Sequence, residues 1–208
     1  MTQAEKTRSI LVKHVPEGTL DYCFELWKRN PFELKLTRTR QTKVGDFTSR
    51  TSGIHPRITL NHDLNQYAFL LTYIHEVAHL HVHLRYGRRA EPHGAEWKLA
   101  FKELLAPVQE NAFPLEILHE LRRHMINPKA SSYADTDLTK ALRLYDKDGH
   151  LAIVLSEIPE GSIFKLQGRY FAKGKLRRTR VVCKEIKSKR SYLVPIDALV
   201  TDVQLSLL

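Results

Sequence analysis

The sequence predicts an α+β domain followed by a small all-β module, and three observations support this division. Up to about residue 126, apolar residues recur at helical spacing between short stretches that alternate apolar and polar residues. After residue 141, short apolar runs and glycines follow one another at intervals typical of antiparallel strands. Between them, residues 127–135 are rich in Pro, Ser, Asn and Asp, as linkers are. We therefore expect domains at 1–130 and 142–208, with a linker at 131–141.

The first domain is expected to contain four helices and three strands. Helical spacing of apolar residues, together with capping and breaking residues, defines the helices. They cover 19–30, a stretch from Asn61 or Asp63 to about Arg85, 94–107 and 114–125. Alternating residues predict strands at 32–42, 47–52 and 57–60, and the basic stretch from Thr37 to Arg50 is expected to form a hairpin.

The second domain is expected to consist of short strands at 151–155, 163–166, 175–183 and 191–194. Glycines at 149, 161, 168 and 174 separate them. The apolar residues of these strands predict a small hydrophobic core. Its expected members are Ile163, Phe164, Leu166, Tyr170, Phe171, Val181, Val182, Tyr192, Leu193 and Val194.

Composition excludes several classes of protein. The chain has 208 residues, of which 42% are hydrophobic and 27% charged, as in ordinary folded domains. Its two cysteines, Cys23 and Cys183, are too few for a disulfide scaffold or a four-cysteine zinc site. No apolar run approaches the roughly 20 residues of a membrane span, and the N-terminus lacks the apolar core of a signal peptide. The expected location is the cytoplasm, in association with the nucleoid if the protein is prokaryotic.

The net charge of +10 is distributed unevenly. Residues 161–208 hold eleven Lys or Arg against three acids, and a second basic stretch runs from Lys35 to Arg57. Such clusters are typical of proteins that bind polyanions, and we expect salt-dependent, sequence-tolerant binding of single- or double-stranded DNA. The predicted contacts are Arg38, Arg40, Lys43, Lys173, Lys175, Arg177, Arg178, Arg180, Lys187, Lys189 and Arg190.

The segment from His75 to His79 has the sequence His-Glu-Val-Ala-His, an HExxH motif within a predicted helix. Residues four apart lie on one face of a helix, so both imidazoles can bind one Zn²⁺ ion. Glu76 follows the first ligand, where its carboxylate can act as the general base on a metal-bound water. Two surface histidines with a chance glutamate would give the same five letters, so the motif needs a further ligand for support.

A catalytic zinc ion takes a third protein ligand and leaves one position open. His81 is expected to face away from His79, and His83 lies about 12 Å along the helix from His75. His93 opens the next predicted helix, which can return it to the first two histidines, while Gly94 allows close approach of the backbone. The remaining candidates are Glu91, Glu96 and His55.

HExxH followed by Pro92-His93-Gly94-Ala95-Glu96-Trp97-Lys98 resembles the SprT-like zinc metalloproteases, which include the DNA–protein crosslink protease Spartan. The resemblance covers roughly residues 20–105 and includes Trp27 and the strand before the HExxH helix. It implies a gluzincin-like protease domain, with His75, His79 and His93 as ligands of one Zn²⁺ ion and Glu76 as catalytic base. It also implies protein substrates, often beside DNA, as in DNA–protein crosslink repair.

The C-terminal module departs from this family, many of whose members carry a zinc ribbon with two cysteine pairs. Cys183 is the only cysteine after Cys23, so we expect a metal-free β-module in place of the ribbon. The sequence thus favours a zinc metalloendopeptidase that acts on DNA-associated proteins. The alternative is a nucleic-acid-binding regulatory protein with a structural or vestigial zinc site. A zinc hydrolase of small substrates is the third hypothesis.

Overall fold

The computed structural model describes residues 1–40, 43–49, 56–129, 135–147 and 153–205. It divides into two compact units, Met1–Arg143 and Leu144–Leu208, each with its own hydrophobic core. Helices and sheets are both present, so the predicted α+β class is confirmed. No helix of the described residues is long and apolar enough to cross a membrane.

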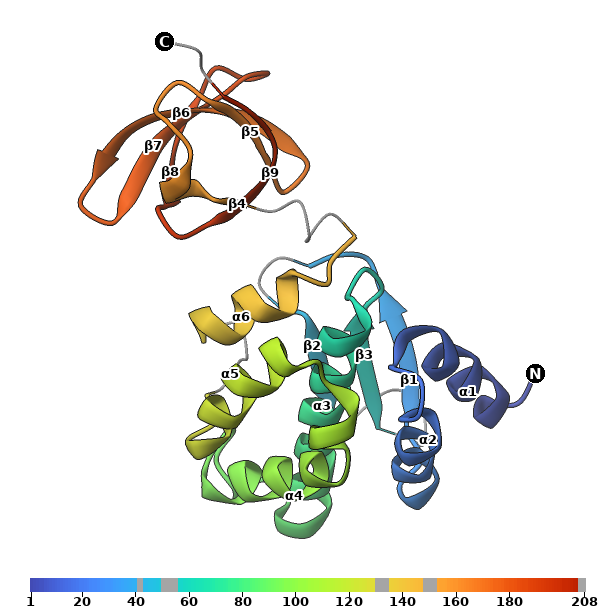
Figure 1. The fold of residues 1–208 in the computed structure, drawn as a ribbon. Coiled ribbons are helices and arrows are strands. Elements are labelled where there is room, and N and C mark those ends of the chain that lie inside the picture. Colours follow the sequence, from blue (N-terminus) through green and yellow to red (C-terminus); the bar gives the residue numbers. More distant parts are fainter. Residues whose placement is uncertain (41–42, 50–55, 130–134, 148–152, 206–208) are drawn as a thin grey trace. The chain divides into compact units, whose positions relative to one another are not determined.

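The N-terminal unit combines helices with a three-stranded sheet (Figure 1). The strands are β1 (Glu33–Thr37), β2 (Gly45–Thr48) and β3 (Arg57–Asn61). The helices are α1 (Gln3–His14), α2 (Leu20–Arg29), α3 (Gln66–Tyr86), α4 (Ala95–Ala112), α5 (Leu115–Ile126) and α6 (Thr136–Arg143).

The sheet has the order β1-β3-β2, with β3 in the centre. β1 runs parallel to β3 and β2 runs antiparallel to it, with Phe47 opposite Ile58. The hairpin predicted between Thr37 and Arg50 is therefore wrong, because β1 and β2 lie on opposite sides of β3. Alternation located both strands, although β1 ends at Thr37 and β2 begins at Gly45, but it carries no information about which strands pair.

The long helix α3 is the centre of the N-terminal unit. Twelve of its 21 residues are buried, and it packs against β2 and β3 and against α4. The Asn65 side chain caps it by accepting hydrogen bonds from the backbone N–H groups of Tyr67 and Ala68, at 3.1 and 3.0 Å. Gly87, with φ +63°, ends it. A helix buried on most sides is held in place by its surroundings, which suits it to carry a site.

Three helices differ from the sequence-based expectation. The helix α1 was not predicted, although Thr2 and Glu5 form a capping box at its start. The helix α4 continues through Pro107, where the prediction ended it; buried Val108 and Ala112 lie on this last part. The helix α6 occupies most of the predicted linker at 131–141 and packs on α5. In each case contacts with distant residues decide a local preference that is weak by itself.

The C-terminal unit is a six-stranded antiparallel sheet in the order β4-β9-β5-β6-β7-β8, whose strands curve around a common core (Figure 1). A short 3-10 helix at Leu155–Glu157 follows β4. The strands are β4 (Ile153–Val154), β5 (Ile163–Leu166), β6 (Arg169–Arg177), β7 (Arg180–Glu185), β8 (Ser191–Pro195) and β9 (Leu199–Gln204). The predicted strand at 175–183 is in fact the end of β6, a turn at Arg178-Thr179, and most of β7.

The core of this unit contains part of the predicted set. Phe164, Phe171, Val181 and Val194 are buried, whereas Tyr170 and Leu193 are 44% and 51% exposed. Further buried members are Leu155, Ile158, Cys183 and Val200. The Cys183 thiol is enclosed in this apolar cluster, and its Sγ lies 3.7 Å from the Val181 carbonyl oxygen.

Substitution of Phe164 by Ala should destabilise the C-terminal unit by about 3–5 kcal/mol, because it opens a cavity among fully buried side chains. Hydrogen exchange measured by mass spectrometry should show faster exchange in β5 to β9. Helices α3 and α4, whose core shares no residue with this one, serve as the internal reference. Leu193→Ala, at an exposed position of the same sheet, is the control, and an equal effect of both variants would contradict the assigned core.

Candidate metal centre

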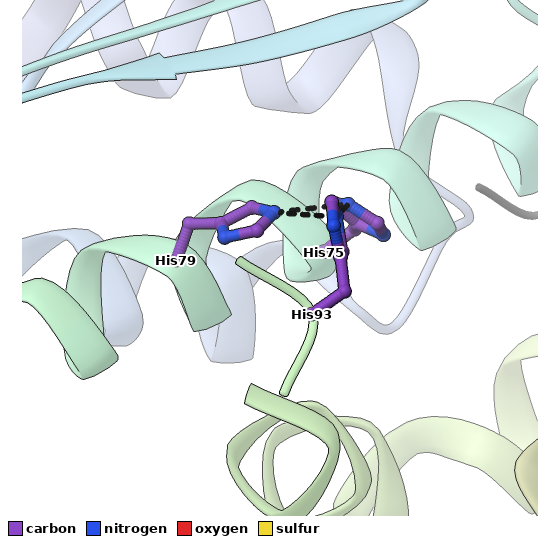
Figure 2. A group of neighbouring side chains, drawn as sticks. All are labelled: His75, His79 and His93. Atoms are coloured by element: carbon purple, nitrogen blue, oxygen red, sulfur yellow. Dashed lines mark hydrogen bonds between the residues drawn. The ribbon is translucent and has the colours of Figure 1, made fainter. Parts of the chain in front are cut away.

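Three histidines of the N-terminal unit converge on one point. His75 and His79 project from α3, and His93 comes from the connection just before α4 (Figure 2). The three Nε2 atoms are 3.2 Å (His75–His79), 3.2 Å (His75–His93) and 3.0 Å (His79–His93) apart. Among the described residues, these three histidines form the group of side chains that could hold a metal ion.

These separations are close to those of a tetrahedral metal site. A tetrahedral ion with metal–nitrogen bonds of roughly 2.0–2.1 Å holds its nitrogens about 3.3–3.4 Å apart. The observed triangle is only slightly smaller, and a point within bonding distance of all three atoms lies just above its plane. A protein that supplies three ligands leaves the fourth position open, as catalytic zinc sites do.

Burial keeps the three imidazoles neutral. Burial, and then the neighbouring His79 and His93, lower the pKa of His75 well below its ordinary value. The pKa of His79 falls to about 4, again mainly through burial, and that of His93 is also lowered by burial. Neutral imidazole is the form that binds a metal ion. Lone pairs that face one another repel, so an ion at their centre would stabilise the arrangement.

A tight turn delivers His93 to the site. The Gly94 N–H donates to the Glu91 carbonyl oxygen at 3.0 Å, so Pro92 and His93 are the central residues of a β-turn. Pro favours the first central position, and the positive φ of His93, +60°, fits the second position of a type II turn. A side chain on Gly94 would lie only 3.1 Å from the Glu91 carbonyl oxygen, so the glycine permits this closure.

Trp97 supports the cluster from α4. Its ring is fully buried and stacks on His79, with ring centroids 5.4 Å apart. Its Nε1 donates to the His75 carbonyl oxygen at 3.4 Å. The sequence marked Trp97 as part of the segment from Pro92 to Lys98, but gave it no role at the metal site. The ring packs against the imidazoles and so fixes their orientation, as residues that surround metal ligands commonly do.

Glu76 directly follows His75 in α3, and its carboxylate is oriented by the sheet. Its carboxylate accepts a hydrogen bond from the backbone N–H of Phe47 in β2. Gly45, at the start of β2, packs so closely that a Cβ there would lie 2.5 Å from Glu76 Oε1 and 2.6 Å from Thr72 Cγ2. Sequence analysis did not single out Gly45 or Phe47, because their role depends on the pairing of β2 with β3.

The environment of Glu76 favours its protonated form. Burial raises the pKa of Glu76 to about 8, and the nearby Asp46 carboxylate adds to the rise. Lys43, the Phe47 N–H and Arg40 act in the opposite direction. A divalent cation at the histidine cluster would lower this raised pKa. The carboxyl group would then lie in the range where it can both accept and release a proton.

The remaining ligand candidates are outside the cluster. His81 faces the other side of α3, as expected, and contacts Asn30 at 3.5 Å. Neither Glu91 nor Glu96 belongs to the three-residue group, and His83 lies against Phe47 with ring centroids 5.7 Å apart. His55 lies outside the described residues.

Two residues near the site have structural partners. The hydroxyl of Tyr73, a fully buried residue, donates to the Cys23 carbonyl oxygen at 2.9 Å, which ties α3 to α2. His124 is also buried, and its Nδ1 lies 3.1 Å from Asp135 Oδ2. That contact fixes α5 to the residue before α6.

Six of the eight predicted nucleic-acid contacts of the C-terminal unit fall into two clusters. Arg177 and Arg180 face each other across β6 and β7, beside Arg178 in the turn. The second cluster, Lys187, Lys189 and Arg190, lies in the β7–β8 connection at the other end of β7. All six are exposed. The six residues of β7 separate the clusters by roughly 17 Å.

Three of the other predicted contacts already have partners within the chain. Lys173 donates to the carbonyl oxygens of Leu155 and Ile158 at 2.7 and 2.6 Å. Arg40 donates to the side chains of Asn61 and Thr59 at 3.0 and 3.2 Å, and Lys43 pairs with Asp46 at 2.5 Å. Arg38 and Lys175 are exposed. Binding of nucleic acid by these residues stays a prediction.

A comparison with protein families matches residues 17–119 to the SprT-like family. This part of the chain belongs to the SprT-like family. The matched region contains β1 to β3, all of α3 and α4, and hence the three histidines and Glu76. The C-terminal unit lies outside it. Comparisons with curated proteins and with solved structures found no match.

Removal of one imidazole should abolish metal binding by the SprT-like domain. We expect the wild-type chain to bind one Zn²⁺ ion and His93→Ala to lose at least 100-fold in affinity, because two ligands from one helix turn leave the ion mostly solvated. Zinc content after dialysis against a competing chelator measures this. His119→Ala, on the exposed face of α5, should retain the ion. A second zinc ion per chain would contradict the metal-free C-terminal unit.

Proposed function

We propose that the chain is a zinc-dependent endopeptidase of a gluzincin-like type. The observation that carries the proposal is the position of Glu76. Its carboxylate is held against β2, and the residue directly follows His75, one of three histidines whose spacing fits one metal ion. A purely structural zinc site has no use for a base in this place. The SprT-like family of residues 17–119 supports a peptidase.

The residues of the site divide the chemistry between them. His75, His79 and His93 would hold Zn²⁺, which when bound lowers the pKa of a coordinated water and polarises the scissile carbonyl group. Glu76 accepts a proton from the attacking water and then donates it to the leaving amine. The Phe47 N–H keeps the carboxylate oriented through both transfers.

The edge of the sheet suits a peptide substrate. β2 pairs with β3 on one side, and no other described strand pairs with it. β2 also contacts α3, the helix that carries His75, Glu76 and His79. An extended peptide can add to such an edge through backbone hydrogen bonds, which recognise a main chain of any sequence. This arrangement supports a peptide bond as the target.

The charge of the C-terminal unit supports substrates that are bound to DNA. Arg177 and Arg180 are directly opposite each other, an arrangement that costs stability unless an anion compensates it. No described residue forms an ion pair or hydrogen bond with the side chains of Arg177, Arg178 or Arg180. Guanidinium groups bind phosphates with two parallel hydrogen bonds. We therefore propose that this unit binds the DNA backbone without reading its sequence.

Glu76→Gln should keep zinc bound and lower cleavage by about 10²–10⁴-fold, because the amide keeps the shape of the carboxylate but accepts no proton. Cleavage of a DNA-bound protein and of an unstructured peptide, with and without single-stranded DNA, measures the effect. Equal cleavage by wild type and variant, or cleavage by neither with zinc confirmed, would favour the alternative of a nucleic-acid-binding regulator with a structural zinc site.

Gly45→Ala tests how the base is positioned. The new methyl group would overlap Glu76 Oε1, so the carboxylate must turn away while the three imidazoles stay in place. We expect normal zinc content and a decrease in kcat of about 10-fold or more, since general-base catalysis requires hydrogen-bond distance to the water. Thr48→Ala in the same strand removes atoms and should have a small effect. Unchanged kcat in Gly45→Ala would show that β2 does not orient the base.

A further inference from the structure

The connection from α3 to the His93 turn is a basic surface that sequence analysis did not single out. Residues 84–92 read Leu-Arg-Tyr-Gly-Arg-Arg-Ala-Glu-Pro, with Arg85, Arg88 and Arg89 against the single acid Glu91. All three arginines are exposed. No described residue forms an ion pair or a hydrogen bond with their side chains. We call residues 84–92, which include the last three residues of α3, the α3–α4 connection.

This connection is held in a defined shape close to the metal centre. The Gly87 N–H donates to the His83 carbonyl oxygen at 2.9 Å, and the Arg89 N–H donates to the Tyr86 carbonyl oxygen at 3.3 Å. The β-turn at Glu91–Gly94 then places His93 in the cluster. Arg89 precedes His93 by four residues, so their Cα atoms are at most roughly 14 Å apart.

Tyr86 adds an aromatic surface to the arginines. The residue is 37% exposed at the end of α3, and the Arg85 guanidinium lies over its ring, 5.3 Å from the centroid. Arginines beside a solvent-accessible aromatic ring are the combination with which proteins hold single strands, through phosphate contacts and base stacking. An acidic peptide would be attracted by the arginines, but its binding would not require the aromatic ring.

The charges on the β2 side of the site are mixed. Asp46, Lys43 and Arg40 all act electrostatically on Glu76, but Lys43 pairs with Asp46. Arg40 donates to Asn61 and Thr59. The exposed arginines of the α3–α4 connection therefore give the SprT-like domain a basic surface of its own, independently of the C-terminal unit.

We propose that the α3–α4 connection is a nucleic-acid contact site, in which Arg88 and Arg89 bind phosphates and Tyr86 stacks on an unpaired base. The contact would hold a single strand within reach of the metal centre. A protein attached to that strand would then be presented for cleavage, a consequence that rests on the proposed peptidase function. The binding itself does not depend on that function.

The test compares two charge-matched double variants of the full chain. Arg88→Ala with Arg89→Ala removes the proposed contacts. Arg122→Ala with Arg123→Ala removes the same charge from α5, where the arginines pair with Glu110, Glu120 and Asp137. Fluorescence anisotropy with a labelled oligothymidylate is measured over a range of salt concentrations. Zinc content reports whether the altered connection still delivers His93.

The first double variant should lower the slope of log K against log salt by about 1.4, since each single-strand phosphate contact contributes roughly 0.7. Its affinity at low salt should fall about 10-fold, while the α5 variant stays near wild type. Tyr86→Leu should lower affinity about 5-fold or more with an unchanged slope, because stacking involves no counterion release.

Equal losses in both double variants would overturn the proposal, because the effect would then be one of total charge. Unchanged DNA binding together with weaker cleavage of acidic peptides would also overturn it and assign the arginines to peptide selection. The proposed peptidase function is tested separately by Glu76-dependent cleavage of an unstructured peptide. If that cleavage is absent from the wild type, the peptidase proposal fails while the binding result still stands.

Discussion

The convergence of three neutral imidazoles on one point is the constraint around which the N-terminal unit is built. Two of them lie one turn apart on α3, so their relation is fixed by the helix itself. The third must come from elsewhere, and the β-turn at Glu91–Gly94 supplies it. The fully buried ring of Trp97 then fills the space behind the imidazoles. Burial on α3 lowers the pKa of His75 and His79 and so favours their neutral form.

The proposed metal ligands and the proposed base are positioned by different parts of the fold. The ligands are positioned by α3, the α3–α4 connection and α4. Glu76 shares the helix with two of them, but the orientation of its carboxylate is set by β2 through Gly45 and the Phe47 N–H. A helix that carries HExxH therefore provides two of the ligands but does not by itself orient the base. The position of the base is a tertiary property of the sheet.

Local rules of helix and turn geometry predict much of this site. They do not predict the contacts between elements that are far apart in the sequence. The spacing of His75 and His79 predicts a shared face, because helix geometry is the same in every protein. The pairing of Pro92 with Gly94 is a local signal for the turn at His93. The roles of Gly45, Phe47 and Trp97 depend on contacts between elements far apart in the sequence. For the same reason the expected β1–β2 hairpin was wrong, since the strand that separates them follows both in the chain.

The left-handed backbone at His93 has a consequence for the history of such a site. Glycine and asparagine adopt this conformation with the least cost, whereas histidine adopts it less often. At this position the backbone preference and the ligand chemistry favour different residues, and a bound ion would compensate for the difference. A lineage that no longer needed the ion would gain stability by drifting to Asn or Gly there. The same turn, and the basic connection before it, would survive as a scaffold without hydrolytic activity.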